Sequence, residues 1–511
     1  MTPLRRLFLI LSVAGLVAAG WFHLRDTGVP GGQTLTVYCA AGLKKPVEII
    51  AGQYQRESGL QVQLQYGGTG ALLSAIRVAQ KGDLFLAADD AGIVDARKFD
   101  AVREVIPFVR QHPVIAVRAG NPKGIRSLAD LERDGVRFAL ANPEAAAIGR
   151  SLRRTLGQKY ETLAARAAVQ KTTVTEIAGD LHLGTVDAAI VWDSTVPQFP
   201  GLEAVEVAEM AGVTENASAA ILASCKESAA ALRFARYLAA PEKGGAIFQQ
   251  HGFKHVGGDR WAEKPELILY SGGVNRPAIE TILKKFTTRE GVTVTTVFNG
   301  CGILCATMKT MGDASDPKFP DAYYACDLCF VPPVAEQFPE AVVLTETDIG
   351  IAVKKGNPRN VRTLADLAQP NLKVGLCNAE QSTLGYMTRG MLKSSGLLEG
   401  IRKNVVVEVP TADLLVNQMR AGGLEAAIVY RVNAAPAAEH IDFLPIQHAG
   451  AKAVQPFAVR TSSPNRQLAG RLLDFLKANR GDFEQAGFLW RGNEAPLKSK
   501  DIVVPDWLKD K

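Results

Sequence analysis

Five of the seven cysteines lie in the second half of the chain, at spacings that suit metal binding or disulfide bonding. A Cys-x3-Cys pair is followed after 20 residues by a Cys-x2-Cys pair and later by one more cysteine; the five are Cys301, Cys305, Cys326, Cys329 and Cys377. Four thiolates at such spacing can bind Zn, Cu(I) or an iron–sulfur cluster. In an oxidising compartment, Cys301 or Cys305 could instead form disulfides with Cys326 or Cys329. Buried thiols that bind nothing are the third alternative, so the sequence leaves their state open.

The second half of the chain repeats the first. Gly68–Leu72 returns as Gly300–Leu304, and Asp187–Trp192 returns as Glu425–Tyr430. A period of this length is far too long for a solenoid repeat, so it indicates two copies of one domain. The first copy has no cysteine where the second has its five; the equivalent positions are Thr69, Leu73, Ala88, Ala91 and Ala141. The cysteine set therefore belongs to one copy only.

Length and composition agree with two globular domains. A chain of 511 residues with 47% apolar and 22% charged residues can form two full hydrophobic cores. The net charge of +6 is spread along the chain without a Lys/Arg cluster, so we expect no nucleic-acid partner. We expect the domains at residues 34–262 and 266–495, with a C-terminal tail at 496–511.

The first 26 residues have the order of an export signal. Arg5 and Arg6 precede the apolar run Leu7–Phe22, and Val17–Gly20 offers small residues for cleavage. Retention of the run as a membrane anchor is the alternative, although about 16 residues are short for a full span. In both cases the two domains lie outside the cytoplasmic membrane, and only this segment contacts the membrane.

Each copy alternates strand and helix signals. In the first copy, Leu35–Tyr38 reads as a strand, Pro46–Glu57 as a helix, Val62–Tyr66 as an alternating strand and Asp83–Ala88 as an apolar strand. This order is typical of a mostly parallel α/β sheet, in which ligands bind at the carboxyl ends of the strands.

Short loops, two of which contain glycine, follow several of these strands and open helices. They are Ala40–Gly42, Gly67–Gly70 and Asn142–Glu144. Helix amino termini expose unpaired N–H groups with partial positive charge, and glycine lets a ligand approach the backbone. Several such loops at one cleft would form an anion receptor that needs no Lys or Arg. Each glycine taken alone could simply permit a tight turn.

Taken together, these segments identify a family. Tyr38–Leu43, Gly82–Asp89, Ala189–Trp192 and Ile247–Phe253 resemble the extracytoplasmic molybdate- and tungstate-binding proteins of ABC importers. The resemblance implies two tandem type II periplasmic-binding domains, each built of two α/β lobes that close on a ligand. We expect the chain to cross between the lobes near residues 110–114 and 193–197, with equivalents near 345–349 and 431–435.

The family binds its tetrahedral oxyanion through two serine hydroxyls, a tyrosine hydroxyl and backbone N–H groups. By position, the resemblance implies that the first copy's ligand-binding residues are Gly42, Thr69, Trp192, Ile148 and Val174. Those of the second copy are Gly273, Cys301, Tyr430, Leu384 and Ala412. Only Thr69 and Tyr430 retain a hydroxyl, so neither copy carries the full molybdate set.

We therefore expect a binding protein that captures a small oxyanion, and the resemblance implies an ABC permease as its partner. The sequence contains no nucleophile, phosphate-loop or zinc-protease motif in a suitable setting, so we do not expect an enzyme. The alternative is a metal- or redox-handling protein, in which the cysteine-lined second cleft holds a thiolate-bound metal: Zn, Cu or an iron–sulfur cluster.

Overall fold

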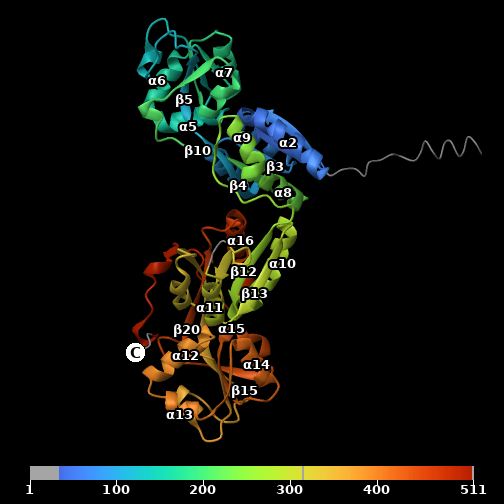
Figure 1. The fold of residues 1–511 in the computed structure, drawn as a ribbon, viewed down its shortest axis with the longest axis vertical. Coiled ribbons are helices and arrows are strands. Elements are labelled where there is room, and N and C mark those ends of the chain that lie inside the picture. Colours follow the sequence, from blue (N-terminus) through green and yellow to red (C-terminus); the bar gives the residue numbers. More distant parts are fainter. Residues whose placement is uncertain (1–33, 313–315, 509–511) are drawn as a thin grey trace, which may run out of the picture. The chain divides into compact units, whose positions relative to one another are not determined.

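The computed structural model describes residues 34–312 and 316–508. The predicted signal or anchor at residues 1–26 lies outside this range. None of the described helices combines the length and apolar character needed to span a membrane. Each copy consists of two α/β lobes, as predicted (Figure 1).

The first lobe of the first copy is a six-stranded sheet in the order β11-β4-β10-β3-β1-β2. Strands β1 and β2 pair in parallel, as do β1 and β3. The strands are β1 (Thr34–Ala40), β2 (Gln61–Gly67), β3 (Leu84–Ala87), β4 (Val102–Gln111), β10 (Glu215–Leu222) and β11 (Lys254–His255), and the helices are α2 (Lys44–Ser58), α3 (Thr69–Ala79), α4 (Asp90–Arg97), α8 (Ser228–Ala239) and α9 (Ala246–Gln250).

The second lobe of the first copy is a five-stranded sheet in the order β7-β6-β8-β5-β9. Figure 1 shows its helices α5, α6 and α7 gathered around β5. The strands are β5 (Pro113–Arg118), β6 (Phe138–Ala141), β7 (Val169–Lys171), β8 (Ala188–Trp192) and β9 (Leu202–Val205), and the helices are α5 (Ala147–Leu156), α6 (Gln158–Arg166) and α7 (Val174–His182).

The second copy repeats both lobes, but its strands form one continuous sheet with the central order β13-β12-β14-β20-β15-β18-β16-β17. Its first lobe contains β12 (Glu266–Gly272), β13 (Thr293–Asn299), β14 (Ala322–Tyr324), β20 (Lys452–Val459), β21 (Leu489–Trp490), β22 (Leu497–Lys498), α10 (Arg276–Glu290), α11 (Cys301–Met311), α16 (Arg466–Ala478) and α17 (Arg480–Gln485). Its second lobe contains β16 (Val374–Cys377), β17 (Val405–Val409), β18 (Ala426–Tyr430), β19 (Ile441–Pro445), α12 (Thr383–Ser394), α13 (Leu398–Arg402), α14 (Ala412–Arg420) and α15 (Arg431–Ala434).

The first crossing between lobes falls where the sequence predicts it in both copies. In the first copy β4 ends at Gln111 and β5 begins at Pro113 in the other sheet. Proline lacks a backbone N–H and so favours a strand end. The equivalent residue is Ile349, and there the strand β15 (Glu340–Lys354) runs uninterrupted through both lobes, pairing with β20 and then with β18.

The second crossing was predicted too early. After β8 the chain adds β9 to the same sheet, pairing with β5, and returns to the first lobe only at β10. The crossing therefore lies between Val205 and Glu215 rather than near residues 193–197. In the second copy β19 likewise pairs with β15, so the crossing lies between Pro445 and Lys452 rather than near 431–435. Both added strands are short and half-exposed, so they lack a clear apolar pattern.

Corresponding elements form for the same local reasons in the two copies. Helices α2 and α10 each end at a glycine in the left-handed region, Gly59 with φ 72° and Gly291 with φ 66°. Such a conformation suits glycine, which has no Cβ to clash. Strands β2 and β13 show the same alternation of exposed and half-buried residues. These shared signals position the strand ends that form the clefts.

Candidate functional site

The five residues predicted for the first cleft come together around one small cavity. Its volume is about 20 Å³, room for roughly one water molecule. The wall comes from strand ends and helix starts of both lobes: Ala40, Ala41, Gly42, Gly67, Gly68, Thr69, Ala88, Ala146, Ala147, Ile148, Thr173, Val174 and Trp192. The lining contains no charged side chain. Ligand binding by these five residues remains a prediction.

Thr69 is the polar side chain that stands out in this wall. It is the first residue of α3 and is 1% exposed, yet its hydroxyl has no hydrogen-bond partner within the described part of the chain. A buried polar atom without a partner costs about 1–3 kcal/mol. The hydroxyl therefore has an unused hydrogen-bonding capacity at the cavity wall.

Three helix amino termini supply further donors to the first cleft. Thr69 begins α3, Ile148 is the second residue of α5, and Val174 begins α7. The first N–H groups of a helix have no partner within the helix. Aimed at one cavity, they favour negative charge without a cationic side chain.

The space of the family's first serine is filled in the first copy. A Cβ added at Gly42 would lie 3.1 Å from Cγ1 of Val174. At the tyrosine position stands Trp192, which is 1% exposed at the end of β8. Apolar groups thus occupy the places of two of the three hydroxyls, as the sequence indicates.

The glycines beside Thr69 allow the two lobes to meet. The Gly70 N–H donates a 2.9 Å hydrogen bond to the Ala145 carbonyl of the opposite lobe. A Cβ at Gly70 would lie 2.2 Å from the Glu144 carbonyl oxygen, and a Cβ at Gly68 would lie 2.5 Å from that of Thr172. No side chain fits at such distances, so these glycines permit closure of the cleft.

An ion pair also joins the lobes of the first copy. Asp89, which is 1% exposed, accepts a hydrogen bond from the Gly92 N–H and so caps α4. Its carboxylate lies 3.0 Å from the guanidinium of Arg150 on α5, and Arg150 also pairs with Asp95 at 3.1 Å. The sequence analysis did not find Arg150, because a pair 61 residues apart leaves no local pattern.

The second cleft brings two of the five cysteines into contact. Cys301 begins α11 and is fully buried, and the Cys326 backbone N–H donates to its sulfur at 3.2 Å. A Cβ on Gly272 would lie 2.1 Å from the Cys326 sulfur, so the glycine makes room for that thiol. All seven cysteines are free thiols in the structure.

The other three cysteines have different surroundings. The Cys305 thiol lies 3.5 Å from the Phe330 carbonyl and 3.6 Å from the Tyr323 hydroxyl. Cys329 interacts with Asp327, and Cys377 with Ser382. Burial raises the pKa of each of these thiols. Among the described residues, no three His, Cys, Asp or Glu side chains are arranged to hold a metal ion. A centre with several thiolates therefore stays a prediction.

The remaining predicted residues of the second cleft occupy places equivalent to those in the first. Leu384 lies in the first turn of α12, Ala412 begins α14, and Gly273 follows β12. Tyr430 ends β18 and is 2% exposed, and its hydroxyl has no hydrogen-bond partner in the described chain.

The sequence analysis also missed Thr383, the first residue of α12. It is fully buried, and its hydroxyl interacts with the thiols of Cys301 and Cys326. The sequence could have indicated Thr383, because it directly precedes the predicted residue Leu384 at the start of a helix.

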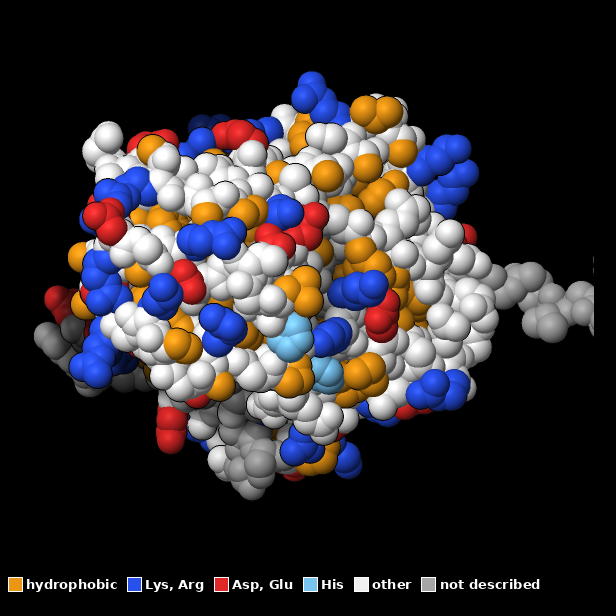
Figure 2. Space-filling view, turned by 90° about the horizontal axis from the view of Figure 1, so that it is seen from above, with side chains coloured by type: hydrophobic (Ala, Val, Ile, Leu, Met, Phe, Trp, Pro, Cys, Tyr) orange, Lys and Arg blue, Asp and Glu red, His pale blue; other side chains and the backbone are white. Residues whose placement is uncertain are grey.

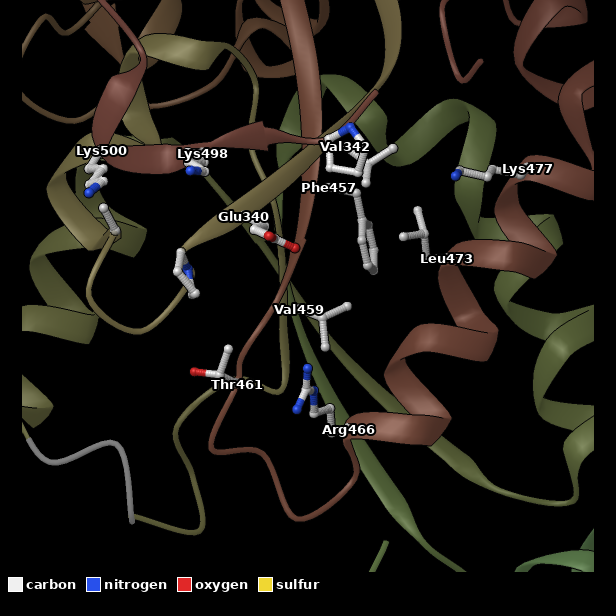
Figure 3. A pocket seen from close by; sticks show the side chains of 13 residues that line it. Glu340, Val342, Phe457, Val459, Thr461, Arg466, Leu473, Lys477, Lys498 and Lys500 are labelled. Atoms are coloured by element: carbon white, nitrogen blue, oxygen red, sulfur yellow. The ribbon is translucent and has the colours of Figure 1, made fainter. Parts of the chain in front are cut away.

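A larger hollow of about 790 Å³ lies elsewhere on the second copy (Figure 3). Phe457, Val459 and Leu473 form an apolar side, while Arg466 and Lys477 extend at its margin. None of the predicted site residues lines it. On the face shown in Figure 2, Lys and Arg side chains are dispersed among acidic and apolar ones rather than gathered into a basic patch.

Comparison with known proteins agrees with this architecture. The family described as bacterial extracellular solute-binding protein matches residues 35–254 and again residues 267–489. The chain is therefore a tandem duplication of such a domain, as the repeat predicts.

Individual relatives each match about one copy or less. A binding protein of Haemophilus influenzae is 33% identical over 159 residues, which are 31% of this chain and 65% of that protein. The chain thus spans about two thirds of that relative. The molybdate-binding protein ModA of Mycobacterium tuberculosis is 27% identical over 47% of this chain and 93% of its own length. The solved periplasmic molybdate-binding protein of Azotobacter vinelandii has 19% identity and a TM-score of 0.37, covering 43% of this chain and 98% of that one.

Proposed function

Since the chain belongs to the bacterial extracellular solute-binding proteins, with one matching region in each half, we propose that it captures a small tetrahedral oxyanion and delivers it to an ABC importer. The observation that carries the proposal is the first cleft. It combines three helix amino termini with the buried, unpartnered hydroxyl of Thr69.

The physical argument rests on charge and hydrogen bonding. An anion entering the cleft replaces water hydrogen bonds with backbone N–H donors that are already oriented. The Thr69 hydroxyl, which is unsatisfied without a ligand, gains an acceptor. No lining carboxylate opposes the anion, because Asp89 is held by Arg150 and caps α4.

The lining also limits which oxyanion fits. A site that offers one side-chain hydroxyl in place of three recognises its ligand mainly through the backbone, so it selects for size and charge more than for a given element. Two curated relatives bear the names molybdate-binding and sulfate-binding protein, at 27% and 26% identity. We propose a tetrahedral dianion of this size class rather than molybdate in particular. The closed cavity of about 20 Å³ holds roughly one water molecule, so the lobes must close around the anion less tightly than they do in this structure.

Closure of the lobes completes the binding step. The Gly70–Ala145 hydrogen bond and the Arg150–Asp89 pair both join the two lobes, and both would be broken in an open form. Ligand captured by closure is shielded from water and presents a closed surface to a permease. The role is binding without chemical conversion.

A second candidate function concerns the second copy alone. The contact between Cys301 and Cys326 favours a metal- or redox-handling cleft, because paired thiols can bind soft metals or form a disulfide. Elemental analysis and thiol titration of the purified chain test this alternative directly.

Calorimetric titration of the full chain with molybdate, tungstate, sulfate and phosphate tests the proposed function. We expect heat of binding with at least one of them, at one site per chain when the second cleft's cysteines are replaced by alanine. Absence of heat with all four would overturn oxyanion capture by the first cleft.

A further inference from the structure

The second cleft contains a pair of thiols where the family places a hydroxyl. Cys301 stands at the position of Thr69 and receives the 3.2 Å hydrogen bond from the Cys326 backbone N–H. Both side chains are at least nine-tenths buried, at 0% and 5% exposure. The pair is therefore enclosed between the lobes, reached only when they open.

The two thiols differ in proton affinity. Burial raises the pKa of Cys301, but the Cys326 thiol and the hydroxyls of Thr383 and Tyr323 stabilise its thiolate, and the pKa falls to about 7. The pKa of Cys326 is raised well above its usual range, first because its proton is shared with Cys301 and then because of burial. Cys301 is therefore the thiol of the pair that gives up its proton more readily.

One hydroxyl of the second cleft lacks a partner. Tyr430 is 2% exposed, and its hydroxyl has no hydrogen-bond partner among the described residues. It stands at the position of Trp192, which lines the first cavity together with Thr69, the equivalent of Cys301. The Thr383 hydroxyl, by contrast, interacts with both thiols of the pair. A ligand that carries oxygen beside its sulfur-binding atom would give the Tyr430 hydroxyl a partner.

We propose that the second cleft captures arsenous acid, a trivalent oxyacid whose arsenic binds sulfur and whose hydroxyl binds the Tyr430 hydroxyl. This deepens the proposed function, because it assigns a substrate class to the second copy of a solute-binding protein. A bare soft cation would use the two sulfurs but leave the Tyr430 hydroxyl unpaired. A tetrahedral dianion would meet two thiols, which are weak hydrogen-bond donors, where the family has a hydroxyl.

The capture step balances without an oxidant. Arsenous acid, As(OH)3, reacts with the thiols of Cys301 and Cys326; two As–O and two S–H bonds break, two As–S bonds form, and two water molecules leave. Arsenic remains trivalent throughout. Cys301 attacks first, the protons of the two thiols go to the two departing hydroxides and form the two waters, and the remaining As–OH faces the Tyr430 hydroxyl.

The test uses the reduced full-length chain with sodium arsenite. We expect a loss of two titratable thiols per chain and a mass gain of one As(OH)3 less two waters. Cys301→Ser and Cys326→Ser should each weaken capture by roughly 100-fold, the lower end of the gain from tethering two binding groups. Cys305→Ser is the matched control and should bind as the parent does, since its thiol contacts Phe330 and Tyr323 instead.

Three outcomes would overturn the proposal. They are unchanged arsenite affinity in both serine variants, a Cys301–Cys326 disulfide in protein isolated without reductant, and binding of Cu(I) by a chain that does not bind arsenite. Tyr430→Phe adds a readout that keeps both thiols, and a several-fold faster release of arsenite is expected from it. Oxyanion binding by the first cleft is measured separately, with Thr69→Ala as its variant. A second cleft that does not bind arsenite would therefore leave oxyanion binding by the first cleft untouched.

Discussion

The two clefts share a frame but differ in the groups that face the ligand. In both copies a Gly-x-Gly loop meets backbone carbonyls of the opposite lobe: a Cβ would lie 2.2 Å from the Glu144 oxygen at Gly70 and 2.0 Å from the Glu380 oxygen at Gly302. The residue between the glycines is Thr69 in one copy and Cys301 in the other. The backbone geometry of closure has been kept, while the side chain that it presents has changed.

The contacts that join the lobes differ as well. In the first copy Arg150 pairs with the buried Asp89. At the equivalent of Arg150 the second copy has Tyr386, whose ring packs edge-on against Phe330 with centroids 5.8 Å apart. Asp327, the equivalent of Asp89, is held by backbone N–H groups of Cys329 and Val454, and burial raises its pKa. An ion pair in the first copy and an aromatic contact in the second copy thus join the lobes at equivalent positions.

Substitution of Arg150 should have the largest effect, on the stability of the first copy. Arg150→Ala removes the cationic partner of the Asp89 carboxylate, which is 1% exposed. Loss of one member of a buried ion pair lowers the free energy of unfolding by about 3 kcal/mol. We expect a lower free energy of unfolding of the first copy in urea, measured by fluorescence. Arg153→Ala is the control, since its partner Glu144 is exposed and such pairs contribute little. Equal effects of the two substitutions on the free energy of unfolding would show that the buried Arg150–Asp89 pair contributes no more than an exposed ion pair.

Substitution of Gly70 by alanine tests whether the glycine loop is needed for the lobes to close. Gly70→Ala places a Cβ against the Glu144 carbonyl, so the closed form should lose about 2 kcal/mol and oxyanion affinity about 30-fold. Calorimetry measures the affinity, and small-angle scattering of the isolated variant reports the open form. Gly179→Ala in α7 meets nothing within 4 Å and should bind normally. Gly302→Ala should act in the same way on the second cleft; retained closure in either variant would contradict this role.

Much of this framework could be predicted from the sequence. The internal repeat predicted both copies, and the resemblance to the molybdate-binding proteins implied the two lobes and the five residues that line the first cavity. The strands β9 and β19 could not be predicted, because four or five half-exposed residues carry no strong pattern. The Arg150–Asp89 pair depends on tertiary packing and leaves no local pattern. The contact of Cys301 with Cys326 is one of the pairings that the sequence predicts, while the larger cysteine cluster stays a prediction.

Truncation of Thr69 measures the polar contribution of the first cleft. Thr69→Ala removes the one lining hydroxyl that lacks a partner, so oxyanion binding should weaken by about 1–2 kcal/mol. Thr162→Ala is the control, because that hydroxyl is exposed and bonds only to the Gln158 carbonyl of its own helix. Calorimetric titration distinguishes them. Unchanged affinity after Thr69→Ala would mean that the backbone alone binds the ligand.

The smallest effect concerns the protonation of Cys301. Its pKa of about 7 lies below the usual thiol value of 9.0 because, against the effect of burial, neighbouring thiol and hydroxyl groups stabilise the thiolate. A lowered pKa stabilises the folded chain fully above the unfolded value of 9.0, and this contribution is lost as the pH falls through 7, so stability should rise between pH 7 and 9. The raised pKa of Cys326 acts in the opposite direction only above pH 9, where this thiol ionises in the unfolded chain. The rate of alkylation is the sharper measurement. Iodoacetamide should modify Cys301 with a half-maximal rate near pH 7, whereas Thr383→Val should move the midpoint toward 9. Cys305, whose pKa burial raises to about 12, is the internal control, and a midpoint for Cys301 near 9 in the parent chain would contradict the stabilised thiolate.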